Sequence, residues 1–217
     1  MTTQRFTVAD VMTKRLVAVL PGAEFKEIAA TMERWGVSAV PVLDGEKRVV
    51  GIVSEGDLLL KQELHGRRLG LVEELRRVND TAKAGSRRAD DLMTSPAVTI
   101  TPGSSLPQAA RSMATHHVKR LPVVDEAGRV QGMVSRSDLL KVFLRPDEEL
   151  ADEVRHEVVA HLFPRSHRSV EVRVVGGVVT MSGTVRDATL IPVAARLART
   201  VEGVVDVQCE LAAGSSE

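Results

Sequence analysis

The chain contains one unit twice. Residues 8–59 align without a gap on residues 89–140 when the sequence is shifted by 81 positions against itself. The longest shared phrase is Gly-Ile-Val-Ser-Glu-Gly-Asp-Leu-Leu at 51–59 and Gly-Met-Val-Ser-Arg-Ser-Asp-Leu-Leu at 132–140. Self-similarity at one fixed offset is the signature of a duplicated structural unit. We therefore expect two like units, packed as a pseudo-twofold pair.

Both copies show the same predicted order of elements. In the first copy, a short strand near 16–19 precedes a Pro-Gly turn, and an amphipathic helix follows at about 25–32. Strands at 39–43 and 49–53 then form a hairpin, and a closing helix begins at the shared phrase. The corresponding elements of the second copy lie at 98–100, 106–113, 121–124 and 130–134. The order βαββα, present twice, predicts an α+β fold.

The last part of the chain follows another pattern. Pro146 and three acidic residues after it start a predicted helix that ends near Pro164. Alternating valines predict a hairpin around Gly176-Gly177, and a second helix spans roughly 188–201. An alternating strand at 205–211 ends the pattern. The order αββαβ predicts a small sheet with two helices on one face.

These patterns divide the chain into five segments. The repeats occupy 1–60 and 89–145, and the αββαβ domain occupies 146–213. Residues 214–217 form a tail that we expect to be disordered. Residues 61–88 carry eight basic and four acidic residues and are predicted to form a helical linker. The linker is either a solvated connector or, through its arginine pairs, a contact for phosphate or an anionic surface.

Composition excludes several classes of protein. Lys and Arg total 29 and Asp and Glu total 29, so no basic excess points to a nucleic acid partner. Aromatic residues make up 2% of the chain, too few for a platform on which bases stack. The N-terminus lacks the apolar core of a signal peptide, and no apolar run approaches the ~20 residues of a membrane span. We therefore expect a soluble, cytoplasmic protein.

The sequence also offers little for catalysis or metal binding. It lacks the glycine-rich phosphate loops and the nucleophile elbow of common enzyme classes. His156 and His161 are five residues apart on a predicted helix, the wrong spacing for a shared metal site. Cys209 is the only cysteine, and its alternating surroundings predict a buried or half-buried strand residue. We expect no enzyme activity, no metal site and no required cofactor.

The shared phrase places a serine and, three residues later, an aspartate at a strand-to-helix junction. The pairs are Ser54 with Asp57 and Ser135 with Asp138. Ser-x-x-Asp before an apolar helix is typical of a capping box. Behind a paired strand, the same geometry directs a hydroxyl and a carboxylate at one cleft, so a structural role and a ligand role are compatible.

The repeats resemble CBS domains, which work in pairs as a Bateman module. The resemblance rests on Asp-Val-Met-Thr13 and Asp-Leu-Met-Thr94, on Val-Ser-Ala-Val-Pro41-Val and Val-Lys-Arg-Leu-Pro122-Val, and on the repeated Gly-x-Val-Ser-x-x-Asp-Leu-Leu. The C-terminal segment resembles a BON domain through Val-Thr-Met-Ser-Gly183-Thr-Val and the later Glu-Gly203-Val-Val-Asp-Val.

The CBS resemblance implies a regulatory ligand that contains adenosine: AMP, ADP, ATP or S-adenosylmethionine. Asp57 and Asp138 would accept hydrogen bonds from ribose hydroxyls, and Ser54 and Ser135 would donate to a phosphate. The strand entrances and nearby apolar side chains would form a slot for adenine. The residues expected to bind the ligand are Thr13, Leu16, Val37, Ala39, Val40, Pro41, Ser54, Asp57, Thr94, Pro96, Val98, Val118, Lys119, Arg120, Leu121, Pro122, Ser135, Arg136 and Asp138.

The two copies differ just before their prolines. Where the first copy has Ser38 and Ala39, the second has Lys119 and Arg120, and its helix start adds Arg136. This basic group resembles the one that CBS nucleotide sensors place on phosphates; the alternative is a solvated strand edge. We expect the phosphate end of the ligand to contact the second copy. The sequence leaves open which cleft is occupied.

The resemblance also implies partners. CBS pairs commonly associate as antiparallel discs, so a homodimer is expected. The BON-like domain implies a protein or phospholipid partner. The leading hypothesis is a sensor that passes a nucleotide signal to the BON-like domain. The alternative is a dimeric scaffold whose BON-like domain binds a protein or an anionic phospholipid surface, with no nucleotide role.

Overall fold

The computed structural model describes residues 6–59 and 88–214. They form two compact units: residues 7–136 hold the repeats, and residues 137–214 form the second unit together with Phe6. Within these described ranges, no helix has both the length and the hydropathy to cross a lipid bilayer. The predicted linker up to residue 87 and the predicted tail beyond residue 214 lie outside the described residues.

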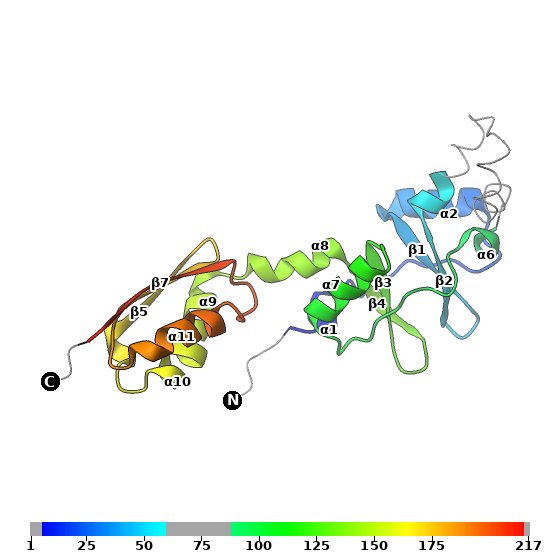
Figure 1. Ribbon diagram of the computed structural model, residues 1–217. Helices are drawn as coiled ribbons and strands as arrows, with labels where there is room; N and C mark the ends of the chain where they lie inside the picture. The colour runs from blue at the N-terminus through cyan, green and yellow to red at the C-terminus, as the bar shows by residue number, and fades with distance from the viewer. Residues whose placement is uncertain (1–5, 60–87, 215–217) are drawn as a thin grey trace, which may run out of the picture. The chain divides into compact units, whose positions relative to one another are not determined.

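The first repeat consists of a helix and a hairpin, preceded by one short helix (Figure 1). Its elements are α1 (Val8–Val11), α2 (Phe25–Trp35), β1 (Ala39–Leu43) and β2 (Val49–Ser54). Helix α2 buries Ile28 and Met32 on one face and is followed by Gly36, whose φ of 61° is left-handed. A residue without Cβ adopts this conformation at low cost, so Gly36 ends the helix. Residues 55–59 form a further helical segment directly after β2.

The second repeat has the same elements in the same order. They are α6 (Ala89–Leu92), α7 (Leu106–Thr115), β3 (Arg120–Val124) and β4 (Val130–Ser135), followed by α8 (Arg136–Leu139) and the 3-10 turn η1 (Leu140–Leu144). The hydroxyl of Ser105 caps α7 by accepting from the N–H of Gln108, and the Gln108 side chain accepts in return from the N–H of Ser105. This reciprocal pair is a capping box.

The predicted first strand of each repeat is shorter in the structure. Residues 16–19 and 98–100 form single parallel bridges, from Val19 to Val42 and from Ile100 to Val123. A Pro-Gly turn follows each segment and ends the pairing, because proline has no N–H to donate. The sheets of this unit therefore have two strands each, β1-β2 and β3-β4, both antiparallel.

The repeats exchange their N-terminal segments. Thr13 pairs with Met133 of the second repeat, and Thr94 pairs with Ile52 of the first. The start of each repeat is thus completed by the hairpin of the other, so the two repeats form one folded unit. This exchange produces the pseudo-twofold pair that the duplication predicts.

Each repeat requires a glycine at the same position of the shared phrase because of this exchange. A Cβ on Gly51 would overlap the Sδ atom of Met93. A Cβ on Gly132 would lie 2.8 Å from the carbonyl oxygen of Thr13 and 3.0 Å from the Sδ atom of Met12. The two glycines correspond at the repeat offset, as do the two methionines. The shared phrase therefore begins with glycine because the other repeat's methionine packs directly against the backbone.

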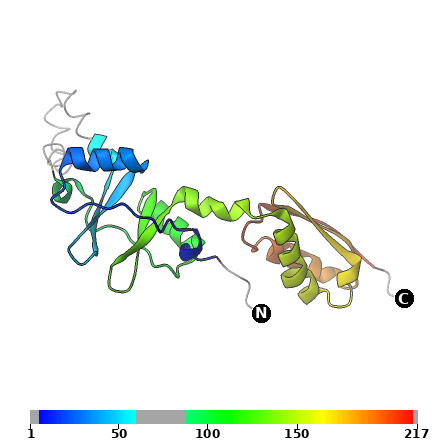
Figure 2. The ribbon, with the colours of Figure 1, turned by 180° about the vertical axis from the view of Figure 1, so that it is seen from behind.

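The C-terminal unit is a three-stranded sheet with its helices on one face (Figures 1 and 2). Its elements are α9 (Asp147–Val154), a π-helical segment (Arg155–Val159), α10 (Ala160–Leu162), β5 (Val170–Val175), β6 (Val178–Val185), α11 (Ile191–Ala198) and β7 (Asp206–Ala213), with 3-10 turns at His167–Ser169 and Ala188–Leu190. Strand β6 is central, antiparallel to β5 and parallel to β7. The predicted order αββαβ is confirmed.

The hairpin of this unit is fixed by the first residue of α9. Asp147 accepts hydrogen bonds from the N–H groups of Gly176 and Gly177 at 2.8 and 2.9 Å. Both glycines have positive φ, at 57° and 76°, as a two-residue hairpin turn requires. Leu150 and Val154 of the same helix are buried in the same core as Met181.

Cys209 is exposed, so the prediction of a buried or half-buried residue is wrong. It lies on β7 in register with Met181, which is fully buried on the central strand. Strand β7 is an edge strand in the described sheet, with no neighbour on its outer side. The alternation of the sequence indicates a face of the strand, but it does not distinguish an edge strand from a central one.

Candidate functional site

Ser54 and Asp57 are joined by hydrogen bonds at the end of β2. Oδ2 of Asp57 accepts from the N–H of Ser54 at 2.9 Å and from its hydroxyl at 2.7 Å. The carboxylate thereby satisfies a backbone donor at the start of the helical residues 55–59. The carboxylate half of the predicted capping box is therefore present in the first repeat, and it holds a hydroxyl and a carboxylate together at the junction.

A cleft of about 280 Å³ lies at this junction. It is lined by Ser38, Ala39, Ile52, Ser54, Glu55, Gly56 and Asp57 of the first repeat and by Thr94, Val98, His117, Val118, Lys119 and Arg120 of the second. The predicted ligand residues brought together here are Ala39, Ser54, Asp57, Thr94, Val98, Val118, Lys119 and Arg120. Its volume is close to the lower end of small-molecule pockets, about 300 Å³.

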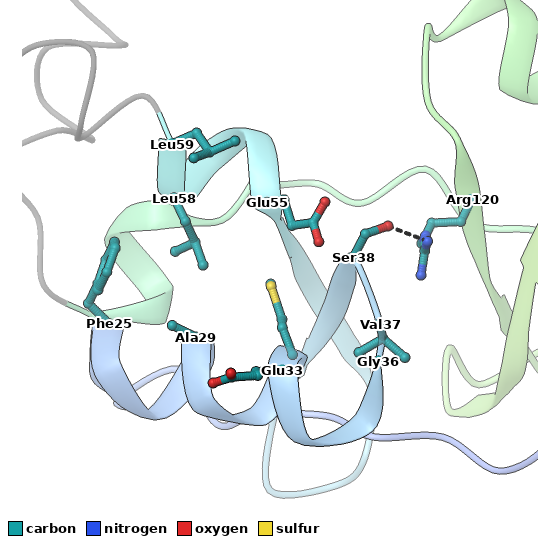
Figure 3. Close-up of a pocket in the computed structure, with 11 residues that line it drawn as sticks. Phe25, Ala29, Glu33, Gly36, Val37, Ser38, Glu55, Leu58, Leu59 and Arg120 are labelled. Carbon is teal, nitrogen blue, oxygen red and sulfur yellow. Dashed lines mark hydrogen bonds between the residues drawn. The ribbon is translucent and has the colours of Figure 1, made fainter.

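The repeats contribute opposite charges to the cleft. Glu55 and Asp57 come from the first repeat, whereas Lys119 and Arg120 come from the second. The guanidinium of Arg120 donates a hydrogen bond to the hydroxyl of Ser38 at 2.5 Å, so it is tied to the first repeat (Figure 3). The cleft thus offers cations for an anionic group and a carboxylate for donors such as sugar hydroxyls.

A larger pocket of about 720 Å³ adjoins the cleft (Figure 3). Its lining comes from α2, the residues after it and the helical segment 55–59: Phe25, Ala29, Met32, Glu33, Gly36, Val37, Ser38, Glu55, Leu58 and Leu59, with Arg120 of the second repeat. Ser38, Glu55 and Arg120 line both spaces and so form their common boundary. Apart from this boundary and Glu33, the described residues that line the larger pocket are apolar or glycine.

Four predicted ligand residues are buried in strands and are not among the residues that line the cleft. Val40 and Leu121 have 0% of their surface exposed, so neither side chain reaches the cleft, contrary to expectation. Pro41 and Pro122, the next residues on β1 and β3, are buried as well. Successive side chains of a strand point to opposite faces, but here both faces of each strand are covered.

The residues predicted at the strand entrances line the cleft in one repeat only. Thr94 and Val98 of the second repeat line the cleft, whereas their counterparts in the first repeat are not among its lining residues. Thr13 and Pro96 are exposed and Leu16 is half-buried, all outside the cleft. Val37, another predicted ligand residue of the first repeat, lines the larger pocket and not the cleft.

The Ser-x-x-Asp pair of the second repeat has other surroundings. Nη2 of Arg136 donates to the carbonyl oxygen of Val118 at 3.1 Å, and Arg136 does not join Lys119 and Arg120 in the cleft. Asp138 is buried, and its Oδ1 lies 2.7 Å from Nζ of Lys141. The first repeat has Leu60 at the position of Lys141, so the two copies differ in sequence at this position. Ser135, at the end of β4, is half-buried.

Five cleft residues were not predicted from the sequence: Ser38, Ile52, Glu55, Gly56 and His117. The repeat offset contained a signal for two of them. Ser38 corresponds to Lys119, and Glu55 corresponds to Arg136, both of which were predicted. Taking the counterpart of every predicted residue would have identified these two positions.

Trp35 lies at the end of α2, and the guanidinium of Arg15 is 5.0 Å from its ring centroid. This distance is within the range of a cation–π contact. Trp35 is 42% exposed and is not among the residues that line either pocket. As the only tryptophan of the chain, it provides a fluorescence signal from the unit that holds the repeats.

Two family models match the chain. The CBS domain model matches residues 8–63 and 89–145, and the BON domain model matches residues 146–214. The two CBS matches contain the two copies of the repeat, and the BON match contains the αββαβ sheet with its helices.

Solved structures share the architecture of the repeats. The crystal structure of CBSX2 from Arabidopsis thaliana in complex with AMP has a TM-score of 0.57 and 28% identity, covering 64% of this chain and 97% of that one. Protein MJ1225 from Methanocaldococcus jannaschii has a TM-score of 0.51 and 29% identity, covering 64% of this chain and 48% of that one.

Relatives found by sequence cover the same region. MJ1225 is 32% identical over 138 residues, which are 62% of this chain and 46% of MJ1225. YhcV of Bacillus subtilis is 29% identical over 133 residues, which are 61% of this chain and 82% of YhcV. Inosine-5'-monophosphate dehydrogenase of Korarchaeum cryptofilum is 28% identical over 161 residues, but only 28% of its length aligns. The chain thus spans about half of MJ1225 and a minor part of the dehydrogenase.

Proposed function

The chain belongs to the CBS-domain family and carries a C-terminal BON domain, and on this basis we propose that it is a non-catalytic sensor of an adenosine-containing ligand. The proposed site is the cleft of about 280 Å³ between the repeats. The observation that carries the proposal is that two sets of residues line one cleft. Ser54 and Asp57 come from one repeat, and Thr94, Lys119 and Arg120 come from the other.

Each group in the cleft has a role in this proposal. The Asp57 carboxylate accepts hydrogen bonds from ribose hydroxyls, and Lys119 and Arg120 bind the phosphate. Val98 and Val118 contact the flat faces of adenine. Two cations at one end favour a phosphorylated ligand over S-adenosylmethionine, whose sulfonium and ammonium groups are positive.

The aspartates of the two repeats have different surroundings. Nζ of Lys141 lies 2.7 Å from the Asp138 carboxylate, so a sugar hydroxyl there would compete with an ion pair. Asp57 is among the residues that line the cleft of about 280 Å³, together with Lys119 and Arg120. This shared lining favours the cleft at Ser54 and Asp57 as the occupied one.

The relatives support AMP as the first compound to test. CBSX2 was crystallised in complex with AMP, and its likeness to this chain extends over 97% of the CBSX2 chain. The region that matches CBSX2 is 64% of this chain, so the comparison bears on the repeats and not on the whole protein.

Isothermal titration of the full chain with AMP, ATP and S-adenosylmethionine tests the proposal. We expect AMP to bind, and we expect Asp57→Asn to weaken binding by about 10-fold or more, the effect of losing a hydrogen bond to a charged group. Asp138→Asn is the matched variant in the other repeat and should leave the affinity within about 2-fold. Exposed Asp91→Asn controls for loss of one charge elsewhere. Absence of binding by all three compounds would refute the function.

We further propose that binding alters the BON domain. A ligand shifts a conformational equilibrium only by its differential affinity for the two states. Hydrogen exchange of residues 137–214 with and without saturating AMP measures this effect. Protection that changes in residues 7–136 alone would restrict the proposed function to ligand binding without a signal to the BON domain.

A second candidate function is supported by helix α11. Val193 and Leu197, four residues apart, are 43% and 39% exposed, and Arg196 lies between them in sequence and is exposed. An apolar stripe with a basic neighbour suits a phospholipid surface. Cosedimentation with vesicles of anionic lipid should fall as salt rises, because charge screening weakens such contacts. Leu197→Ser should abolish it; binding unaffected by both changes would exclude this surface.

The assembly that we propose is a homodimer. Leu59 and Leu140 correspond at the repeat offset, and both are exposed, at 55% and 60%. Exposed leucines at equivalent positions suit a symmetric contact between copies. Light scattering after size exclusion should give twice the mass of 23.5 kDa, and Leu59→Glu with Leu140→Glu should give the monomer.

A further inference from the structure

Glu55 is an acidic residue in a cleft that otherwise suits an anion. It lines the cleft together with Lys119 and Arg120, and it is exposed. The equivalent position of the second repeat is Arg136, the opposite charge. The shared phrase therefore has one position at which the two copies differ in the sign of their charge, and the negative member lies in the cleft.

Ser38 holds Glu55 and Arg120 near each other. The N–H of Glu55 donates to the carbonyl oxygen of Ser38 at 3.0 Å, and Arg120 donates to the hydroxyl of the same residue. In Figure 3 the Glu55 carboxylate and the Arg120 guanidinium lie on the two sides of Ser38. A phosphate bound by Arg120 would therefore be close to the Glu55 carboxylate.

The space beyond this boundary is unsuited to further phosphates. It is the larger pocket, whose only charged lining residues are Glu33, Glu55 and Arg120 among the described residues. The rest of its lining is mainly apolar, including Phe25 and Leu58. A phosphate chain that extended past Arg120 would leave water for apolar surface and pass two carboxylates, which is unfavourable.

From this geometry we infer that Glu55 is a specificity-determining residue that makes the cleft select a nucleoside monophosphate over the di- and triphosphate. The inference rests on the proposed function, because it concerns the same cleft. Each added phosphate brings negative charge toward Glu55, while the cationic side chains that line the cleft in the described part of the chain remain Lys119 and Arg120. The cleft's volume of about 280 Å³ acts in the same direction, since a triphosphate is the bulkier ligand.

The test is isothermal titration of the full chain with AMP, ADP and ATP, without magnesium, for the native protein and three variants. Glu55→Gln removes the charge with little change of shape, and Glu55→Arg gives the first repeat the residue of the second. Glu33→Gln is the matched control, because Glu33 lines the larger pocket but not the cleft. Thermal unfolding followed by Trp35 fluorescence shows that each variant is folded.

We expect the native protein to bind AMP at least about 10-fold more tightly than ATP. Glu55→Gln should reduce this ratio about 5-fold, Glu55→Arg should reduce it further, and Glu33→Gln should leave it within about 2-fold. The effect of Glu55→Gln should shrink at high salt, where charge interactions are screened. If AMP and ATP both bind and Glu55→Gln leaves their ratio unchanged, the inference is wrong while the proposed function stands. If no adenine nucleotide binds, both are refuted.

Discussion

Nη2 of Arg145 lies 2.8 Å from Oε2 of Glu153, and the two side chains are only 14% and 15% exposed. Arg145 also donates to the carbonyl oxygen of Glu202 at 2.7 Å, so one guanidinium joins the start of the C-terminal unit to the loop before β7. Removing one partner of a nearly buried pair leaves the other charge without compensation.

We expect Arg145→Ala to lower the free energy of unfolding of this unit by about 3 kcal/mol. Circular dichroism during urea unfolding measures the loss. Arg155→Ala is the control in the same unit, since its ion pair with Asp152 is exposed and should be worth about 1 kcal/mol or less. Equal losses in the two variants would contradict the importance of burial at Arg145.

A second prediction concerns the glycine that begins the shared phrase. Gly51→Ala should destabilise the repeats by about 2 kcal/mol or more, because the new methyl group overlaps Sδ of Met93. Gly45→Ala, where nothing lies within 4 Å of the added Cβ, is the control. Urea unfolding followed by Trp35 fluorescence reports on this unit. Met93→Ala should restore part of the loss in the double variant, and full additivity would argue against the contact.

This glycine also shows how far the sequence predicts the fold. The offset of 81 and the short apolar runs on either side of a turn predict both hairpins, because short-range patterns determine strands and turns. These patterns do not reveal that Met93 packs on Gly51 of the other repeat, because they describe each repeat separately. Contacts between copies become visible only in the folded pair, and they decide where the cleft lies.

The sequence predicts only part of the cleft, because residues of both repeats line it. Ser54, Asp57, Lys119 and Arg120 were identified from motifs, and they meet in one space. Val40 was predicted to contribute an apolar side chain to the adenine slot, but it is fully buried in the core. Alternation separates the two faces of a strand, whereas the solvent exposure of each face depends on what packs against it.

A third prediction follows from Asp10 at the start of α1. The pKa of its carboxyl is held below its ordinary value, chiefly because the N–H of Thr7 donates to Oδ2 at 2.7 Å, and then because the Thr7 hydroxyl does the same. A carboxyl with a lower pKa in the folded state stabilises it above the unfolded pKa, and this contribution is lost as pH falls through the folded pKa.

Carbon-detected NMR titration should therefore place the midpoint of Asp10 below about 3.9, the ordinary value for aspartate. Thr7→Val removes the hydroxyl but keeps the N–H, so its midpoint should lie between the native value and the ordinary one. A native midpoint at or above the ordinary value would contradict the two hydrogen bonds.

The last prediction concerns Cys209 on the edge strand β7. The residue is exposed, yet partial removal of its thiol from water raises the pKa above that of a free cysteine, while nearby Arg199 acts in the opposite direction. Because the thiolate is the reactive form, alkylation by iodoacetamide at pH 8 should be slower in the folded protein than in urea. Arg199→Gln should raise the pKa of Cys209 further and slow the reaction again. A folded protein that reacts as fast as the unfolded chain, with no response to Arg199→Gln, would contradict this environment for the thiol.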